Sequence, residues 1–490
     1  MNIIIRQSFW STLIIYLGVV LGFVNSIILF PKFLSTEQIG LIRQIISAAT
    51  LLIPLTTYGV NASYIKFYPS FKDNKNQKNQ FFLYELIVII ICFSIVFIFL
   101  NIFFDSISNL FTKKSALLFQ YFDVFILILF TLSISTLFES YLKARYDTVL
   151  NNFINGVSNR LLTALSLFLF SSLLINFDQF IYFQVIIYAF GVTALIIYAY
   201  QKEKIELNFN FKSIKYKIKE IFNYSSFAFI GSFSNIIVLN IDVLMVTSIL
   251  GLSETGIYTT AFYIGMIIEI PRRAISQIST PFISENIKEN NFKKIEKNYK
   301  DVSIHQMLIG VLFYVILILN VDNIFNLIPN SKEFSAGKDV VYIIGLSRLV
   351  IMVFSYNSEL ISFSKYYKFT VITIIALAVI TVTLNFYLIP EYGMVGAAYA
   401  SLLSLIFFNL IKYIFIKIKM KITPFSINSI KTVLVGIFVY LAVLSIPESN
   451  NTIVDIIIKT TLSSFIFVIT AYTLKISPEL NKLIKNKIII

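Results

Sequence analysis

The sequence predicts an all-α polytopic membrane protein with about 14 transmembrane helices, and this prediction rests on its composition and its apolar runs. Of its 490 residues, 57% are hydrophobic and 13% are charged, whereas soluble domains average roughly 45–50% apolar and about 25% charged residues. A single cysteine, Cys92, and a single histidine, His305, exclude a disulfide framework and a histidine-rich metal or catalytic centre. The composition therefore disfavours a soluble enzyme, and it indicates no metal and no cofactor.

Fourteen apolar runs follow one another along the chain, and each is interpreted as one spanning helix of about 20 residues, the thirteenth being the shortest. The runs cover residues 8–30, 41–65, 82–104, 116–141, 151–174, 179–200, 222–250, 256–283, 302–322, 336–362, 369–389, 394–416, 432–446 and 454–474. Pro390 and Gly393 divide the eleventh run from the twelfth, because both residues favour turns. The loops do not exceed about 20 residues, which leaves no room for a soluble catalytic domain.

Lysine and arginine residues are distributed unevenly between the two sides of the predicted bundle. With the N-terminus inside, 29 of the 40 fall on the cytoplasmic side, and five fall on the other side: Lys32, Lys113, Lys114, Lys332 and Lys338. Because cytoplasmic loops carry an excess of Lys and Arg, this pattern predicts that both termini are cytoplasmic. The same rule accounts for the net charge of +14 without a nucleic-acid partner. The lysine-rich loop at 201–221 would touch anionic membrane lipids instead.

Short motifs recur in the two halves of the sequence at nearly one offset. Leu34–Gly40 opens the second run, and the similar Leu252–Gly256 opens the eighth. A second pair of similar segments begins at Pro69 and at Pro281, where the same two runs end. This repeat predicts two six-helix lobes and a terminal helix pair. The expected boundaries are 1–210, 211–417 and 418–490.

Three stretches of the sequence resemble a known family. They are Pro31–Gly40, the stretch from Ile241 to Ala261, and the stretch from Leu384 to Ala400. In these motifs and in its topology, the sequence resembles the polysaccharide transporter group of the multidrug/oligosaccharidyl-lipid/polysaccharide superfamily, a MATE-like superfamily. That group includes flippases for O-antigen and other lipid-linked oligosaccharides. The resemblance implies two helical lobes around a cavity that opens alternately to each side, and a polyprenyl-pyrophosphate-linked glycan as cargo.

Five arginines interrupt the apolar runs and are candidates for binding such a cargo. A charge at the centre of a span costs about 2.5–3.5 kcal/mol, so each one needs a partner or a watery cavity. The guanidinium fork suits a pyrophosphate, because it donates two parallel hydrogen bonds and stays charged when desolvated. The candidates are Arg43, Arg160, Arg272, Arg273 and Arg348. Glu269 precedes Arg272 and Arg273 by three and four residues, so neutralisation within one helix is the alternative for that pair.

Two acidic residues lie deep in the predicted spans. Asp242 belongs to the seventh run and Glu269 to the eighth. An intramembrane carboxylate marks either a site for a coupling cation or proton, or a counter-ion for a neighbouring arginine. The sequence leaves both interpretations open for each residue.

Gate candidates occupy matching positions in the two halves. Glu139 and Glu359 lie near the cytoplasmic ends of their runs, where they would form gating ion pairs or simply be solvated. Pro54 and Pro271 interrupt the second and eighth runs. Because proline removes a backbone hydrogen bond, both helices are candidate hinges, with a static kink as the alternative.

The function predicted from these features is a flippase that moves a polyprenyl-pyrophosphate-linked oligosaccharide, an O-antigen or similar surface polysaccharide unit, across the bacterial inner membrane by alternating access. The alternative is a MATE-like multidrug or cation antiporter, whose cavity should be lined by acids rather than arginines. A membrane glycosyltransferase or polymerase would need paired carboxylates or a large outward loop, and the sequence has neither, so an enzyme is not expected. The expected partners are the glycan lipid and membrane lipids. Other polysaccharide assembly proteins, and coupling to a Na⁺ or H⁺ gradient, are left open.

Overall fold

The computed structural model describes residues 3–204, 206, 209–289, 291–477 and 481, and these residues form helices and turns without a strand. Within them, 11 helices are long and apolar enough to cross a membrane, or 12 if the bent pair Ser331–Val353 and Asn357–Phe363 forms one span. The predicted class, a multi-pass α-helical membrane protein, is therefore confirmed. The expected count of 14 is not reached by this measure.

The way two helices break explains the lower count. The helix α19 (Tyr367–Lys419) counts once although it has 53 residues, which would extend about 80 Å if it were straight. Its backbone leaves the helical region at Gly393, with φ 59° and ψ −143°, so it consists of two helices that meet there, while Pro390 stays inside the first. The predicted eighth run divides into α13 (Leu252–Gly265), a 3₁₀ turn and α14 (Ile270–Lys288). The count of 14 therefore stays a prediction.

By packing, the chain divides into two compact units, Met1–Gly256 and Ile257–Ile490. The first unit takes in the helix expected to be the seventh, α12, whereas the repeat in the sequence predicts a boundary at residue 210. Packing and duplication are different criteria, so the predicted lobes stay a prediction. The α-helices of the first unit are α1 (Ile3–Phe23), α2 (Phe30–Phe33), α3 (Thr36–Thr57), α4 (Val60–Phe71), α5 (Lys75–Ile102), α6 (Phe104–Ser108), α7 (Ala116–Gln120), α8 (Phe122–Lys143), α9 (Val149–Phe153), α10 (Asn159–Ser171), α11 (Phe177–Lys202), α12 (Lys215–Ile249) and the start of α13.

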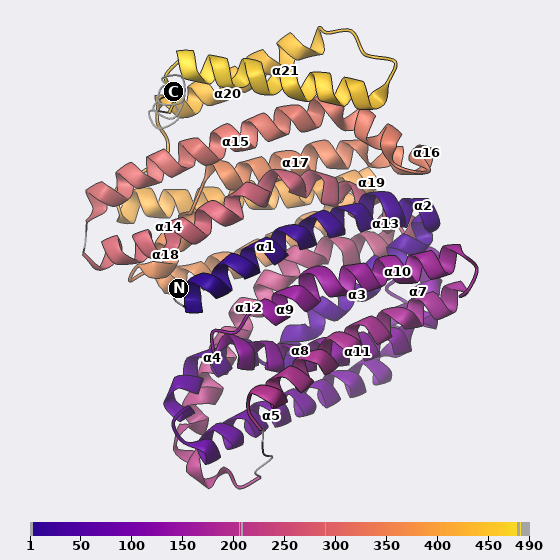
Figure 1. The fold of residues 1–490 in the computed structure, drawn as a ribbon, viewed down its shortest axis with the longest axis vertical. Coiled ribbons are helices and arrows are strands. Elements are labelled where there is room, and N and C mark those ends of the chain that lie inside the picture. The colour runs from indigo at the N-terminus through magenta and orange to yellow at the C-terminus, as the bar shows by residue number, and fades with distance from the viewer. Residues whose placement is uncertain (1–2, 205, 207–208, 290, 478–480, 482–490) are drawn as a thin grey trace. The chain divides into compact units, whose positions relative to one another are not determined.

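Within the first unit, α8 packs against α3, α4, α5 and α11, and α12 packs along α3 (Figure 1). Two π-helical segments, Val24–Leu29 and Ile154–Ser158, interrupt the α1–α2 and α9–α10 pairs. The largest fully buried side chains of this unit are aromatic and come from α4, α5, α8 and α11. Tyr64 of α4, for example, stacks on Phe81 of α5 with 5.0 Å between the ring centres.

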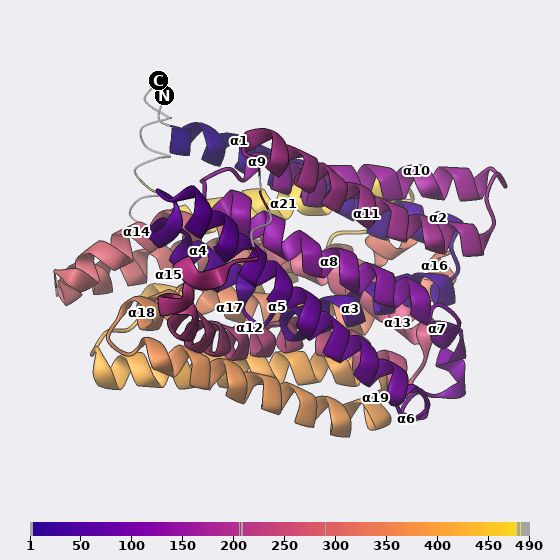
Figure 2. The same ribbon diagram turned by 90° about the horizontal axis from the view of Figure 1, so that it is seen from below.

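The second unit is built around α15 (Phe292–Leu327), which packs against α14, α17, α20 and α21 (Figures 1 and 2). Its other α-helices are α16 (Ser331–Phe334), α17 (Lys338–Val353), α18 (Asn357–Phe363), α19, α20 (Ile427–Leu444) and α21 (Thr452–Thr473). A buried ion pair in α21 joins Lys459 Nζ to Asp455 Oδ2 at 2.8 Å, and Asn323 of α15 donates to the same oxygen at 2.6 Å. The hydrogen bond from Asn323 links α21 of the terminal helix pair to α15.

Candidate functional site

The carboxylate of Glu269 joins two of the predicted site arginines in the second unit. Arg272 Nη1 lies 3.2 Å from one of its oxygens and Arg348 Nη1 lies 3.4 Å from the other. Glu269 closes the 3₁₀ turn Met266–Glu269, and Arg272 follows in the first turn of α14. Arg348 comes from α17 and is 79 residues away in sequence from the carboxylate that it meets.

Two glycines allow α17 to approach this turn closely. A Cβ on Gly345, one turn before Arg348, would lie 3.1 Å from Ile268 Cδ1. A Cβ on Gly265, at the end of α13, would lie 2.8 Å from Ile344 Cγ2. Both distances are shorter than ordinary carbon contacts, so larger residues would push α17 away from the turn and separate Arg348 from Glu269.

Glu359 and Lys412 extend this group, which we call the charged cluster: Glu269, Arg272, Arg348, Glu359 and Lys412. Arg272 Nη2 lies 3.8 Å from Glu359 Oε1, and the hydroxyl of Ser276 donates to the same oxygen. Lys412 of α19 donates to Ser358 Oγ at 2.9 Å, and Glu359 and Arg272 both act on it electrostatically. The side chain predicted as a gate, Glu359, thus belongs with the predicted arginines rather than to a separate helix end.

The charged cluster carries an excess of positive charge and unused hydrogen-bonding atoms. Its three cations face two carboxylates, and Lys412 and Arg348 are 1% and 7% exposed. Arg272 Nε, Arg348 Nε and Glu359 Oε2 are buried and have no hydrogen-bond partner among the described residues. Buried polar atoms normally find partners, so these three atoms are the ones available to a further ligand or to water.

Arg43 and Arg160 are the two predicted site arginines of the first unit, and both contact the helical stretch from Gly22 to Phe30. Arg43 Nη2 donates to Ser26 Oγ at 2.6 Å, with its guanidinium 5.0 Å from the ring centre of Phe30. The guanidinium of Arg160 lies against Gly22, where an added Cβ would come within 2.7 Å of Nη1. Both side chains therefore approach the end of α1 and the π-helical segment that follows it.

The remaining predicted site residues are Asp242 and Arg273. Asp242 is buried in α12, at 4% exposure. The side chain of Arg273 lies outside the described residues. Roles in ion coupling and in substrate binding stay predictions for both.

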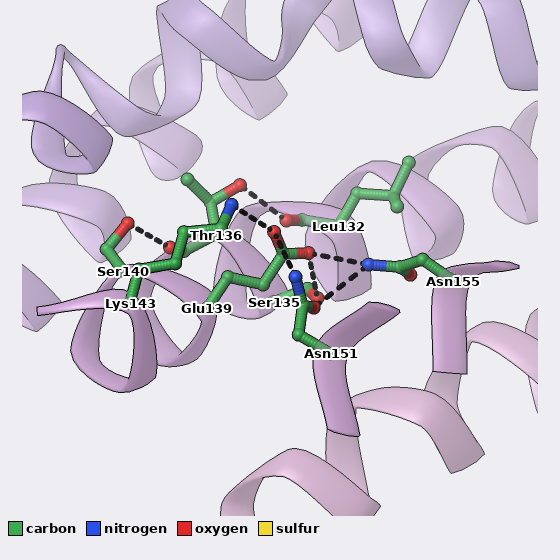
Figure 3. A network of polar contacts seen from close by, with 8 residues as sticks. All are labelled: Leu132, Ser135, Thr136, Glu139, Ser140, Lys143, Asn151 and Asn155. Carbon is green, nitrogen blue, oxygen red and sulfur yellow. Dashed lines mark hydrogen bonds and ion pairs between the residues drawn. The ribbon is translucent and has the colours of Figure 1, made fainter. Parts of the chain in front are cut away.

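Glu139, the other predicted gate carboxylate, fastens α8 to α9 and the π-helical segment that follows (Figure 3). One of its oxygens accepts from Asn155 Nδ2 at 3.0 Å, and the other accepts from Asn151 Nδ2 at 3.3 Å and from Lys143 Nζ at 3.1 Å. The hydroxyl of Ser135 donates to the first oxygen at 3.2 Å. The ion pair with a nearby lysine is present, but every partner belongs to the first unit, and a gating role stays a prediction.

Both helices predicted to be hinges are interrupted close to their prolines. After Pro54, α3 ends at Thr57, and Tyr58 and Gly59 take left-handed conformations with φ 45° and 78° before α4 begins. Pro271 lies in the first turn of α14, directly after the 3₁₀ turn that ends α13. The interruptions are therefore real, whereas movement about them stays a prediction.

The repeated motifs that open α3 and α13 contact each other reciprocally. A Cβ on Gly40 would lie 1.8 Å from the carbonyl oxygen of Leu252, and a Cβ on Gly256 would lie 2.0 Å from that of Thr36. Each glycine thus contacts the residue that lies four positions before the other glycine in the sequence. The hydroxyls of Thr36 and Ser253 are 2.8 Å apart. Only glycines permit this approach.

Two buried charged residues escaped the sequence prediction. Lys412 lies near the end of an apolar run, where the sequence does not distinguish it from the lysines of the following loop. Glu85 lies in α5 at 1% exposure, near the start of an apolar run. The signal that reveals both is a lone charge within an otherwise apolar window of the length of a span.

Comparison with solved structures relates this fold to known transporters. The lipid II flippase MurJ in an inward closed conformation is similar with a TM-score of 0.79 and 15% identity, covering 95% of this chain and 98% of that one. An inward-facing multidrug resistance MATE family transporter of the MOP superfamily has a TM-score of 0.68 and 13% identity, covering 82% and 94%. A MOP superfamily transporter from Pyrococcus furiosus has a TM-score of 0.56 and 14% identity, covering 86% and 95%. A search of curated protein sequences found no match.

Fold and site together define a multi-pass membrane protein with the helix arrangement of flippases and transporters, and these structural neighbours are not enzymes. Residues 4–287 match the family described as polysaccharide biosynthesis protein. The chain belongs to that family, and the family predicted from the sequence motifs is thereby confirmed.

Proposed function

We propose that this protein flips a polyprenyl-pyrophosphate-linked oligosaccharide, an O-antigen or similar surface polysaccharide unit, across the bacterial inner membrane, with both termini cytoplasmic. The observation that carries the proposal is the excess of buried positive charge in the charged cluster. Arg272 and Arg348 share Glu269, and Arg272 also approaches Glu359, so three basic side chains have two carboxylates between them once Lys412 is included. A buried charge without a matched partner is expensive, and an anionic cargo would compensate it.

The chemistry of a pyrophosphate suits the unused atoms of the cluster. Phosphoryl oxygens accept hydrogen bonds, and the Nε–H groups of Arg272 and Arg348 are buried donors without partners among the described residues. Guanidinium groups bind phosphate through two parallel hydrogen bonds, and a buried lysine adds a point charge. The expected cargo headgroup is therefore the diphosphate, while the glycan stays unspecified by these contacts.

Alternating access is supported by the reciprocal contact of Gly40 and Gly256. The topology predicted from the lysine pattern puts these helix starts at the outward side. Their tight contact is what an outward gate needs when it is closed, and the interruptions at Tyr58–Gly59 and at the end of α13 supply joints at the other ends of the same helices. Membrane lipids, and other polysaccharide assembly proteins, are the partners proposed with this role.

The antiporter alternative predicts a different electrostatic preference. An organic cation would be repelled by the surplus cation of the cluster, so this observation favours the anionic cargo. The experiment is therefore to compare two lipids that differ only in charge. Purified protein in nanodiscs would be given polyprenyl pyrophosphate and, as the uncharged control, polyprenol.

The sharpest variant removes Arg348, one of the three cations of the cluster. Arg348→Ala leaves Glu269 with Arg272 and should keep normal membrane abundance, yet it removes a charge-assisted bond worth about 1.5–3 kcal/mol. We expect the Kd for polyprenyl pyrophosphate to rise roughly ten- to hundredfold, with partial rescue in Arg348→Lys and no change in polyprenol binding. Lys219→Ala, which removes an exposed cation of α12, is the matched control. Unchanged binding by folded Arg348→Ala, or preferential binding of a lipophilic cation, would overturn the proposal.

A further inference from the structure

A carboxyl group lies buried in the first unit without a cationic partner. Glu85, in the membrane-spanning helix α5, is 1% exposed, and the hydroxyl of Ser63 in α4 donates to its Oε1 at 2.7 Å. This is the one side-chain hydrogen bond of its carboxylate among the described residues, and none of their ion pairs includes it. The carboxylates of Glu139, Glu203, Glu269, Glu359 and Asp455 each have an amide or a cation beside them.

Two cations of the first unit, Arg145 and Lys78, form ion pairs with another carboxylate. Arg145, in the turn after α8, and Lys78 of α5 both pair with Glu203. The guanidinium of Arg145 also lies 3.5 Å from the ring centre of Tyr141. The titratable groups that interact electrostatically with Glu85 are phenols, Tyr64 from α4 and Tyr84 from α5, and Arg145 acts on Tyr64 rather than on the carboxyl. No neighbouring charge therefore compensates an ionised Glu85.

We propose that Glu85 is a proton-binding site that couples an H⁺ gradient to the conformation of the α3–α4 break. An ionised carboxylate in an apolar interior costs several kcal/mol unless it is paired, so a proton or a metal cation must accompany it. A sodium ion needs several oxygen ligands at once, and Ser63 offers a single hydroxyl. The geometry therefore fits H⁺ better than Na⁺, and the role in coupling rests on the transport function proposed above.

The hydroxyl of Ser63 links the proton to the backbone of α4. It lies 2.7 Å from Glu85 Oε1 and 3.3 Å from the carbonyl oxygen of Val60, yet it has one hydrogen to donate. When Glu85 is ionised, that hydrogen goes to the carboxylate. When Glu85 is protonated, its own O–H donates to Ser63 Oγ, and the Ser63 hydrogen is released to Val60. Val60 is the first residue of α4, directly after Tyr58 and Gly59, so protonation strengthens the first turn beyond the break.

Proton binding is tested by infrared difference spectroscopy on the purified full-length protein in nanodiscs, titrated from mildly acidic to alkaline pH. We expect a carboxylic-acid C=O band with slow hydrogen–deuterium exchange that is lost in Glu85→Gln and unchanged in Glu37→Gln, which removes an exposed carboxyl at the start of α3. In Ser63→Ala the band should persist but shift, because its hydrogen bond is lost. If the band survives in folded Glu85→Gln, or if Na⁺ rather than pH changes it, Glu85 is not the proton site.

The link to the break is tested by hydrogen exchange of peptides covering residues 58–67, corrected for the intrinsic pH dependence. The wild type should exchange more slowly in this segment when Glu85 is protonated, whereas Glu85→Gln and Ser63→Ala should each show one pattern at all pH values. A pH response that persists in both variants would overturn the coupling. Neither measurement uses the cargo, so failure of the lipid-binding experiment above and failure of this proposal are separate outcomes.

Discussion

The reciprocal contact of α3 and α13 makes a quantitative prediction for two alanine substitutions. In Gly40→Ala the new Cβ would start 1.8 Å from the Leu252 oxygen, and in Gly256→Ala it would start 2.0 Å from the Thr36 oxygen. Either variant must therefore move the two helix starts apart by about 1.5 Å before an ordinary contact distance of 3.4 Å is restored. Overpacking of this kind costs about 1–3 kcal/mol, so each variant should disfavour the closed contact roughly five- to hundredfold.

The double variant distinguishes this reasoning from general damage. Because one separation of the helix starts relieves both clashes, Gly40→Ala/Gly256→Ala should cost about as much as either single change rather than their sum. The control is Gly231→Ala in α12, where an added Cβ meets no atom within 4 Å. That control also measures the gain in helix propensity that alanine brings, about 1 kcal/mol.

The assay uses the hydroxyl pair beside the glycines. Thr36→Cys with Ser253→Cys, in a Cys92→Ser background, places two thiols where the hydroxyl oxygens are 2.8 Å apart. The rate of oxidative cross-linking then reports the population of the closed contact, and it should fall in both single alanine variants and no further in the double. Strictly additive effects, or cross-linking as fast as in Gly231→Ala, would refute the tight reciprocal contact.

Two further predictions concern polar anchors. Glu139→Ala leaves the amide of Asn151 without its acceptor and leaves Asn155 with Asn151 Oδ1 as its acceptor. We therefore expect a loss of about 1–3 kcal/mol of stability, seen as a lower Tm in detergent. An unchanged Tm would show that these hydrogen bonds do not hold α9 to α8. Asp455→Ala leaves the buried ammonium of Lys459 with one ion-pair partner, the exposed Glu448 at 3.2 Å. We expect a loss of up to about 3–5 kcal/mol and a lower membrane abundance, whereas Asp455→Ala/Lys459→Met should recover it. Equal loss in the double variant would contradict the ion-pair account.

Much of the fold could be predicted from the sequence because a bilayer imposes a simple pattern on it. Long apolar runs indicate spanning helices, and the breaks at Gly393 and beside Pro54 and Pro271 follow from backbone preferences of single residues. The ends of helices are harder to predict where the chain bends within a single apolar run. The predicted eighth span is divided by the 3₁₀ turn Met266–Glu269, and the flanking Gly265 and Pro271 indicate an interruption but not its type.

The candidate site could be predicted as a set of residues but not as a geometry. The pairing of Glu269 with Arg272 follows from helical spacing, whereas its pairing with Arg348 depends on how α17 packs against the turn. That approach requires small residues at Gly265 and Gly345, whose role becomes visible only when the helices are placed. Similarly, the two glycine motifs could be recognised as repeats, but their contact with each other could not.

The break of α19 at Gly393 bears on how this part of the chain enters a membrane. A Cβ on Gly396 would lie 2.0 Å from the carbonyl oxygen of Leu388, so the two halves of α19 turn back within a few residues. From Phe369 to Leu410 the one charged side chain is Glu391, beside that turn, while Lys368 and Lys412 flank the outer ends. Insertion of this hairpin in one step, from the side of the lysines, moves a single carboxyl group through the hydrocarbon layer. The two helices can therefore be integrated as a preformed pair, with their backbone hydrogen bonds already made.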